Sequence, residues 1–300
     1  MRKRLVYRID DVGYTEAYDM GIKKVIESGI GCSADVMFDS MDCVEILKWL
    51  KDRPWISIGW HRHLWERPVC DPSEVKSMVD EEGRFKWRHR KTHLMSEATY
   101  QDCYKEFDKQ MQLCYSILGK YPDVATSRNT NLEIDKAYMD ILDKYNIAHG
   151  VFSTTADHKH QMVADEKYRH LNYISVNIQP DPSVGFDLAH FKEYNPLEKM
   201  TSLTWTDKEE IYFYGFHPGY CDDYIMAESS CNLHRCKELQ AALSDQYRNW
   251  IIENKIELIN QRDAIYGTNE LQDHFKQINS PLWIGNMKWD YYKIIFLPSK

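Results

Sequence analysis

The sequence predicts an α/β protein folded as a single, irregular (β/α) barrel. Apolar runs of strand length alternate with segments whose apolar residues recur at helical spacing, starting with residues 5–9 and 15–27. About seven or eight such strand–helix units follow one another without a linker between them. Because each helix returns the chain to the same end of the sheet, strands connected in this way pair in parallel.

The expected elements follow in order along the chain. Strands are expected at residues 5–9, 34–38, 55–60, near 124, 147–152, 173–176, 211–216 and 256–259. Helices are expected at residues 15–27, 40–50, 98–118, 134–145, 233–243 and 246–253. Gly29 and Gly31 end the first helix, and Ser40 is suited to cap the second, because its hydroxyl can accept a hydrogen bond from a first-turn N–H group.

An excursion at residues 66–95 interrupts this rhythm with Pro72, Gly83 and few apolar residues. Long loops in a compact domain usually serve function. We expect one barrel domain over residues 1–279, with the excursion inside it, and a C-terminal extension at residues 280–300 packed on the barrel. The sequence contains no internal repeat and no low-complexity segment.

The composition argues against nucleic-acid and membrane partners. The formal charge of −8 at pH 7 disfavours polyanions, and no run approaches the roughly 20 apolar residues of a membrane span. Residues 1–4, of which the last three are basic, look like the start of a signal peptide. Arg8, Asp10 and Asp11 follow before an apolar region forms, so we expect a cytoplasmic protein. Eight cysteines without a CxxC pair are expected to be reduced thiols, most of them in the core. The oligomeric state stays open, a homo-oligomer included.

Two adjacent carboxylates, Asp10 and Asp11, stand where the first strand ends. In one interpretation the strand stops at Ile9 and the carboxylates open a turn towards Gly13, one of them capping the next helix. In a (β/α) barrel, however, catalytic groups occupy the C-terminal ends of the strands. Neighbouring carboxylates repel each other and resist burial unless a cation or proton chemistry uses them, so we expect this pair in the active site.

Histidines follow two further strands at the same expected rim. His61 and His63 end the strand at residues 55–60 and share one face of it, about 7 Å apart, which suits two ligands of one metal. His217 follows the strand at residues 211–216, ahead of a Pro-Gly turn that fixes the backbone. Metal-assisted hydrolysis needs this set of groups: a metal to acidify water, a carboxylate to accept the proton and an imidazole to protonate the leaving group.

Four short motifs stand in a fixed order: RIDDVG at residues 8–13, GWHRHL at 59–64, HPGY at 217–220 followed by Asp222, and Ser229-Ser230, Arg235 and Glu238-Leu239. They resemble the NADDFG, GxHxxL, HPGY and Ser-Ser…Arg…Glu-Leu motifs of the YdjC-like carbohydrate deacetylases. The likeness extends from about residue 4 to about residue 265 and includes the excursion. Each motif is short, but four of them in the same order are specific together.

The resemblance implies a barrel of the NodB-deacetylase type and a divalent cation such as Mg, Zn, Ni or Co. It implies hydrolysis of the N-acetyl group of an amino sugar or a short oligosaccharide. In it, Asp10 is the general base, and Asp11 and His61 are metal ligands. His217 stands where an acid or an oxyanion-stabilising group is expected.

Several residues are candidates for contacts with a carbohydrate substrate. They are Trp60, Trp65, Arg128, Tyr220, Asp222 and Arg235. Aromatic rings at the rim of a cleft stack on sugars, although a ring in the core only fills volume. Arg235 would bind a substrate phosphate or carboxylate, unless it pairs with Glu238 one turn along its helix.

One family motif, DSHxxxH, is altered in this chain. Near residue 124, Thr126 replaces the acid, and Arg128 replaces a histidine that should ligate the metal. An arginine cannot ligate a metal, so the site is weakened unless another group replaces this histidine. The candidate replacements are His63, Asn129, Asn131 and residues 157–160. Alternatively, Arg128 pairs with Asp10 or Asp11 in place of the metal, and the chain is a non-catalytic barrel that binds a saccharide or a protein partner.

Overall fold

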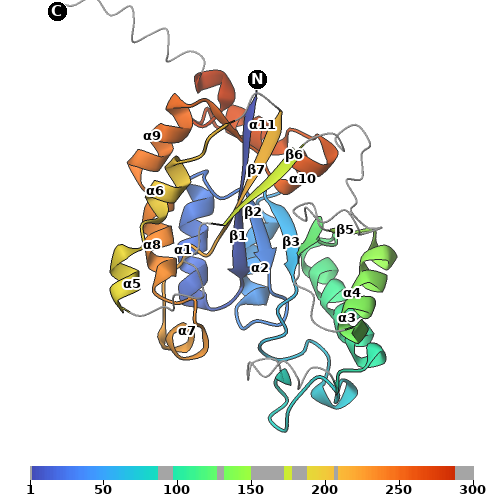
Figure 1. The fold of residues 1–300 in the computed structure, drawn as a ribbon. Coiled ribbons are helices and arrows are strands. Elements are labelled where there is room, and N and C mark those ends of the chain that lie inside the picture. Colours follow the sequence, from blue (N-terminus) through green and yellow to red (C-terminus); the bar gives the residue numbers. More distant parts are fainter. Residues whose placement is uncertain are drawn as a thin grey trace, which may run out of the picture.

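One sheet of eight strands runs through the centre of the computed structural model, which describes residues 2–86, 97–126, 132–149, 172–177, 188–205 and 209–287 (Figure 1). The strands are β1 (Lys3–Val12), β2 (Ser33–Val36), β3 (Ser57–His61), β4 (Val124–Thr126), β5 (Ala148–His149), β6 (Asn172–Asn177), β7 (Glu210–Phe216) and β8 (Ile256–Leu258). Every pairing between these strands is parallel. The expected α/β class is therefore confirmed.

The described strands form a half-barrel in the order β5-β4-β3-β2-β1-β7-β6, with β8 paired to β1. β1 lies in the middle, because β7 pairs with it from Lys3 to Ile9 and β2 pairs with it from Arg8 to Val12. Among the strands that the structure describes, no pairing joins β5 to β6. The carboxyl end of β1 is thus flanked by the ends of β2 and β7.

Helices cover the sheet and return the chain between parallel strands. They are α1 (Glu16–Glu27), α2 (Cys43–Lys51), α3 (Tyr100–Leu118), α4 (Leu132–Tyr145), α5 (Leu188–Glu193), α6 (Pro196–Thr201), α7 (Asp223–Glu228), α8 (His234–Ala242), α9 (Asp245–Glu253), α10 (Gln261–Tyr266) and α11 (Glu270–Gln277), with a short 3-10 helix, η1 (Pro72–Glu74). α8 packs against α1 and α6, and α3 packs against α2 and α4 (Figure 1). None of the described helices has the length and apolar character that crossing a membrane requires.

The sequence did not predict α5, α6, α7, α10 and α11. Four of them have six residues, which is less than two turns, so an apolar period cannot repeat along them. The residues that cap three of these helices were the sequence signal that could have predicted them. Asn195, Asp222 and Asn260 each accept a backbone hydrogen bond from the first turn of their helix.

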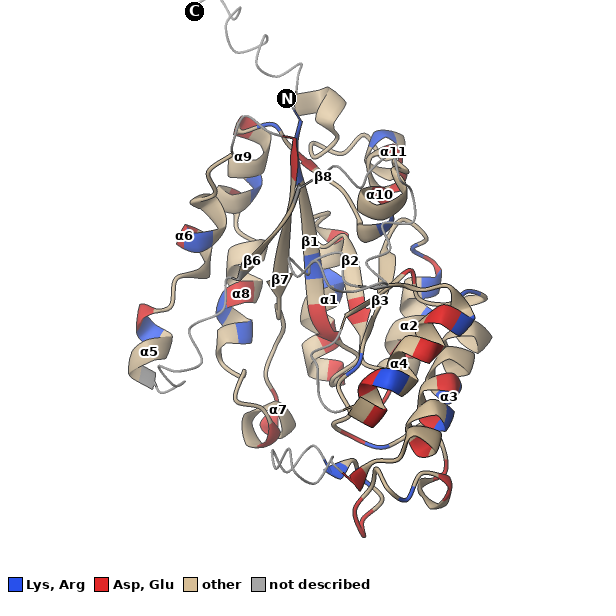
Figure 2. Cartoon of the chain, turned by 45° about the vertical axis from the view of Figure 1, so that its right-hand side comes forward, with Lys and Arg blue, Asp and Glu red and all other residues tan. Residues whose placement is uncertain are grey.

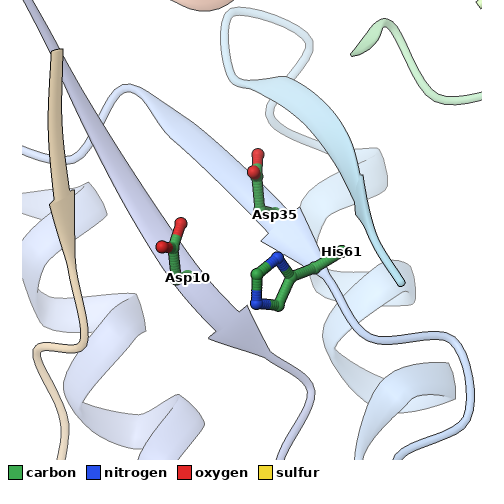
Figure 3. Close-up of side chains that lie close together, drawn as sticks. All are labelled: Asp10, Asp35 and His61. Atoms are coloured by element: carbon green, nitrogen blue, oxygen red, sulfur yellow. The ribbon is translucent and has the colours of Figure 1, made fainter. Parts of the chain in front are cut away.

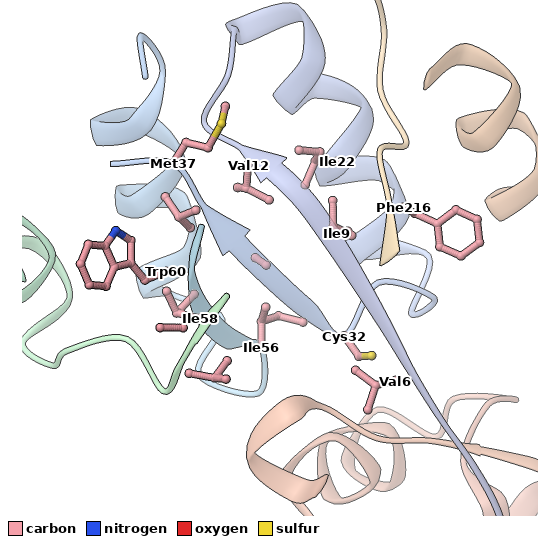
Figure 4. Packing of buried hydrophobic residues seen from close by; sticks show 14 of the residues in the cluster. Val6, Ile9, Val12, Ile22, Cys32, Met37, Ile56, Ile58, Trp60 and Phe216 are labelled. Carbon is pink, nitrogen blue, oxygen red and sulfur yellow. The ribbon is translucent and has the colours of Figure 1, made fainter. Parts of the chain in front are cut away.

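The hydrophobic core surrounds β1, as is typical of a parallel strand that is buried on both faces. Val6, Ile9 and Val12 of β1 are fully buried, together with Ile22 of α1 and Phe216 at the end of β7 (Figure 4). A charged side chain in such a strand must find a buried partner, because water cannot reach it. This requirement governs the carboxyl end of β1.

The structure describes the predicted excursion up to residue 86. Hydrogen bonds to Glu106 hold the excursion against α3. The Glu106 carboxylate accepts the N–H groups of Val69 and Cys70, both at 2.9 Å, and the side-chain amide of Gln110 at 2.8 Å. Glu106 is fully buried, and burial raises its pKa to about 7. The expected C-terminal extension is described only up to residue 287, where Leu282 and Met287 are buried.

Ionisation of Glu106 is expected to lower folding stability as the pH rises. Its pKa of about 7 in the folded protein exceeds the ordinary value of 4.5, so the folded state binds the proton more tightly than the unfolded state. The stability is present below the ordinary pKa and is lost as the pH rises to about 7, by up to about 3 kcal/mol. Urea unfolding between about pH 5 and pH 8 measures this change. Glu106→Gln cannot ionise, so the free energy of unfolding of the native chain should fall relative to that variant, and a constant difference would contradict the prediction.

Candidate active site

Five ionisable side chains meet at the carboxyl edge of the sheet. They are Asp10 and Asp11 at the end of β1, Asp35 in β2, His61 at the end of β3 and His217 directly after β7. Figure 3 shows Asp10, Asp35 and His61 pointing toward one another from three neighbouring strands. The strands β3, β2, β1 and β7 are consecutive in the sheet, which is why residues far apart in sequence form one site.

An irregularity at the end of β1 lets two adjacent carboxylates face the same site. Neighbours along a regular strand point to opposite faces of the sheet. The pairing of β1 with β2 shifts register between Ile9 and Val12, and Asp11 has a φ of 59°, in the left-handed region that aspartate tolerates better than most residues. The Tyr18 hydroxyl of α1 donates to the Asp10 carbonyl at 2.8 Å and so fixes this stretch.

Asp11 makes three polar contacts across the site. Its Oδ1 lies 3.1 Å from His61 Nε2, and its Oδ2 lies 2.7 Å from Arg235 Nη2 and 3.6 Å from His217 Nε2. Burial raises the pKa of Asp11, but His217, Arg235 and the two other histidines together hold the pKa well below its usual range. Asp11 therefore stays ionised, and Arg235 is its buried counter-charge.

Asp10 is held by Arg8, which stands two residues earlier on the same face of β1. Arg8 Nε lies 2.6 Å from Asp10 Oδ1, and Arg8 Nη2 donates to Asp10 Oδ2 at 2.8 Å. The same Nε lies 3.5 Å from Asp35 Oδ2. Burial raises the pKa of Asp10, but the Arg8 guanidinium, together with His61 and His217, brings the pKa below its ordinary value. Arg8 thus supplies the positive charge that a metal ion would otherwise bring to this carboxylate.

Asp35 is a site residue that the sequence patterns did not identify. It is fully buried, and Thr126 Oγ1 donates to its Oδ2 at 2.7 Å. Burial raises the pKa of Asp35. A Cβ atom on Gly59 would stand 1.9 Å from Asp35 Oδ1, so the glycine of the GxHxxL motif makes room for this carboxylate. The sequence signal that could have identified Asp35 is that it is the one carboxylate inside the apolar run at residues 34–38.

The donor atoms of the site fit a divalent cation in type and spacing. One ligand atom from each of Asp10, Asp35 and His61 lies within 4.8 Å of the other two, which makes these residues a candidate metal-binding triad. Among the described residues, the buried Oδ1 of Asp35 has no hydrogen-bond partner. Carboxylate oxygens and imidazole nitrogens are common ligands of divalent metals. Arg8 would compete with a cation for the triad, because its guanidinium already forms an ion pair with Asp10.

The three histidines differ in place and in pKa. Burial lowers the pKa of His217 to about 4, so its imidazole is neutral at pH 7. Burial also lowers the pKa of His61, but the hydrogen bond with Asp11 contributes to a net increase. The ring of His63 lies 5.9 Å from that of His61 and 5.4 Å from that of Trp65, measured between centroids. Burial lowers the pKa of His63, which is not part of the triad.

Helix α8 contributes two buried residues to the site. Arg235 reaches Asp11, and Glu238 accepts the backbone N–H of His217 at 2.6 Å and the Tyr194 hydroxyl at 2.8 Å. Burial raises the pKa of Glu238 to about 7. Arg235 and Glu238 of the fourth motif thus position Asp11 at the end of β1 and His217 in the loop after β7.

Two predicted sugar-stacking rings are buried. Trp60 lies in the core and not at the rim of a cleft, because its side chain is fully buried and its Nε1 donates to Gln110 at 2.9 Å. Its ring packs on those of Phe107 and Tyr138. Trp65 is 8% exposed and lies beside His63.

The other predicted substrate contacts are held in different surroundings. The Tyr220 hydroxyl accepts a hydrogen bond from Lys24 Nζ at 2.7 Å on the surface. Asp222 caps α7 by accepting the N–H of Ile225 at 2.9 Å. The side chain of Arg235 is 1% exposed, so its guanidinium binds Asp11 in the interior.

Arg128 lies outside the described residues, as do Asn129, Asn131 and residues 157–160. The salt bridge expected of Arg128 is therefore not tested. Within the part of the chain that the structure describes, Arg8 and Arg235 form such bridges to the two carboxylates of β1.

A cavity of about 680 Å³ lies at the opposite end of the sheet. Its lining includes Trp55 and Ile56 ahead of β3, Asp123 ahead of β4 and Arg262 of α10. None of the five ionisable side chains at the carboxyl edge lines it. The cavity is thus separate from the candidate active site.

Fold and site together define a class of protein: a parallel α/β half-barrel with carboxylates, histidines and buried arginines at the carboxyl ends of its strands. A profile described as "YdjC-like protein" matches residues 4–253. The chain belongs to the YdjC-like family, as the four motifs indicated.

Curated relatives and a solved structure align along most of the chain. The carbohydrate deacetylase of Clostridium beijerinckii is 24% identical over 264 residues, which cover 87% of this chain and 99% of that protein. Carbohydrate deacetylase 2 of Listeria innocua is 23% identical over 274 residues, covering 87% and 98%. The crystal structure of a proposed cellobiose-phosphate cleavage protein from Enterococcus faecalis V583 has a TM-score of 0.66 at 20% identity, covering 87% of this chain and 98% of that one. The last comparison shows a shared fold.

Proposed function

We propose that this protein is a metal-dependent carbohydrate deacetylase, which hydrolyses the N-acetyl group of an amino sugar or a short oligosaccharide. The proposal is carried by the convergence of Asp10, Asp35 and His61 beside Asp11 and His217 at the carboxyl edge of the sheet. Membership of the YdjC-like family and the relatives named carbohydrate deacetylase support it.

A divalent cation, when bound, supplies a Lewis acid that polarises the acetyl carbonyl and acidifies a water molecule. His61 would hold the cation in either of two arrangements. In the first, which the resemblance implies, Asp11 is its partner, and the Oδ1 of Asp11 lies 3.1 Å from His61 Nε2. In the second, Asp10 and Asp35 complete the triad with His61.

The protein's own residues position and move the protons. In the first arrangement Asp10 is not a metal ligand and would act as general base by accepting a proton from water, which requires Arg8 to release one of the two carboxylate oxygens that it holds. The neutral imidazole of His217 can donate a hydrogen bond to the acetyl oxygen as negative charge develops there. Glu238 fixes the backbone of His217 through its N–H group and so orients this donor.

Acetate release from N-acetylated chitooligosaccharides, with protein purified without a histidine tag, tests the proposal. We expect release with at least one of Mg, Zn, Ni and Co, and loss of release on chelation. Asp10→Asn should lower the rate by about 100- to 10,000-fold, because general acid–base catalysis contributes that much. Asp71→Asn is a control, because this carboxylate is exposed in the excursion, far from β1 in sequence, and caps η1.

Metal content measured by mass spectrometry distinguishes the two arrangements. His61→Ala should lose the metal in both. Asp11→Asn should lose it only in the first, and Asp35→Asn only in the second. Metal bound equally by all three variants would contradict both arrangements.

The arginine pairs favour a second candidate function, a non-catalytic barrel that binds a saccharide or a protein partner. Arg8 and Arg235 neutralise two buried carboxylates without any metal. Saccharide binding in calorimetry, without bound metal and without acetate release, would support this function over the deacetylase.

A further inference from the structure

Two cysteines beside the site lie in contact with each other. Cys221 lies in the loop after β7 and Cys236 lies in the first turn of α8, and their Sγ atoms are 3.8 Å apart. Both side chains are partly exposed, as is Cys231, whereas the other five cysteines are buried. The pair is therefore accessible to small oxidants, which the buried thiols are not.

The two cysteines belong to the segments that carry His217 and Arg235. The Cys221 thiol donates to the Asn232 carbonyl at 3.0 Å, and the N–H of Gly219 donates to the Arg235 carbonyl at 3.2 Å. Two hydrogen bonds thus already join the loop to the start of α8 beside the cysteine pair. A covalent bond between the two sulfur atoms would fasten together the elements from which His217 and Arg235 reach Asp11.

We propose that Cys221 and Cys236 form a reversible disulfide when the protein meets hydrogen peroxide. The Cys236 thiolate attacks one peroxide oxygen, the O–O bond breaks, hydroxide leaves and Cys236 becomes a sulfenic acid. The Cys221 sulfur then attacks the Cys236 sulfur, the S–S bond forms, the S–O bond breaks, and water leaves with the Cys221 proton. Two thiols lose two electrons, and one peroxide is reduced to two water molecules.

Cys236 is the better nucleophile of the pair. When Cys236 ionises, the Cys221 thiol can donate to the thiolate in place of the Asn232 carbonyl, which lowers the pKa of the Cys236 thiol to about 6 and raises the pKa of Cys221. Cys236 also follows the start of α8 by two residues, where the positive end of the helix favours a thiolate. The sulfur atoms must approach from 3.8 Å to a bond length of about 2.0 Å, which small shifts of the loop and of the first helical turn can supply.

Peptide mapping of the full chain after treatment with hydrogen peroxide tests the proposal. We expect one cross-linked peptide that joins Cys221 to Cys236, with a mass loss of two hydrogen atoms that dithiothreitol reverses. The melting temperature of the oxidised chain should rise, because the bond closes a loop between residues 15 positions apart. Neither readout depends on deacetylase activity.

Three serine variants complete the test. Cys231→Ser should still form the cross-link, because Cys231 is the nearby cysteine outside the pair. Cys221→Ser should leave a sulfenic acid on Cys236 that dimedone labels, and Cys236→Ser should abolish both products. Cross-links through Cys231, or irreversible oxidation of Cys236 without a cross-link in the native chain, would overturn the proposal.

Discussion

Arg8→Asn is expected to strengthen the binding of a divalent cation by about ten- to a hundredfold. The Arg8 guanidinium lies 2.6 Å from Asp10 and 3.5 Å from Asp35, so an ion that enters the triad approaches a fixed positive charge. Two unit charges about 4 Å apart repel each other by about 4 kcal/mol at an effective dielectric constant near 20. Asparagine removes this charge and keeps a small polar side chain. Titration calorimetry with Zn²⁺ and Ni²⁺ measures the change in affinity.

The matched control for Arg8→Asn is Arg4→Asn on the same strand. Arg4 is also buried, but it pairs with Glu209 at 2.7 Å near the start of β1, so its loss should leave the metal affinity unchanged. Without metal, Arg8→Asn should unfold about 3–5 kcal/mol more easily, because Asp10 and Asp35 lose their buried counter-charge. If neither the native chain nor this variant binds a cation, the deacetylase proposal is wrong and the non-catalytic function gains support.

The sequence predicted the fold because its strongest signals are periodic and local. Each long helix repeats an apolar spacing over several turns, and the strands between them are short apolar runs. Strands that alternate with helices pair in parallel. Parallel pairing in turn brings the carboxyl ends of β1, β3 and β7 to one edge of the sheet. Parallel pairing alone therefore predicts that Asp10, His61 and His217 lie at one rim.

The site residues and pairings that the sequence did not predict depend on contacts between segments far apart in the chain, which no local pattern shows. Asp35 became a site residue only through the pairing of β2 with β1 and β3, since a lone carboxylate in an apolar run has no spacing to reveal it. Arg235 is 224 positions from Asp11 in the sequence, and only the packing of α8 against α1 brings it there. Only Arg128 was expected from the sequence to pair with Asp10, although Arg8 stands two residues before it and the strand period places both on one face.

Arg235→Met is expected to lower the free energy of unfolding by about 3–5 kcal/mol in the absence of metal, the cost of removing one partner from a buried ion pair. The Arg235 side chain is 1% exposed, and its Nη2 lies 2.7 Å from Asp11. Its guanidinium also lies 4.6 Å from the centroid of the Tyr18 ring. Methionine keeps the apolar stem of the side chain, so the expected loss reports mainly on the charge. Urea unfolding at neutral pH measures it.

Asp11→Asn in the Arg235→Met background separates charge from packing. With the carboxylate neutralised, no unpaired buried charge remains, so the double variant should be more stable than Arg235→Met alone and the double-mutant cycle should be strongly non-additive. Additive losses would mean that Arg235 stabilises the fold by packing.

The two arginine variants together locate the cation without any assay of activity. An ion held by His61 and Asp11 replaces the charge lost in Arg235→Met, so Zn²⁺ should restore the stability of that variant. An ion held by Asp10, Asp35 and His61 replaces the charge lost in Arg8→Asn, and Zn²⁺ should then restore only that variant. Arg235 pairs with the carboxylate of the first arrangement, and Arg8 pairs with the carboxylates of the second. The variant whose stability Zn²⁺ restores therefore identifies the carboxylates that bind the ion.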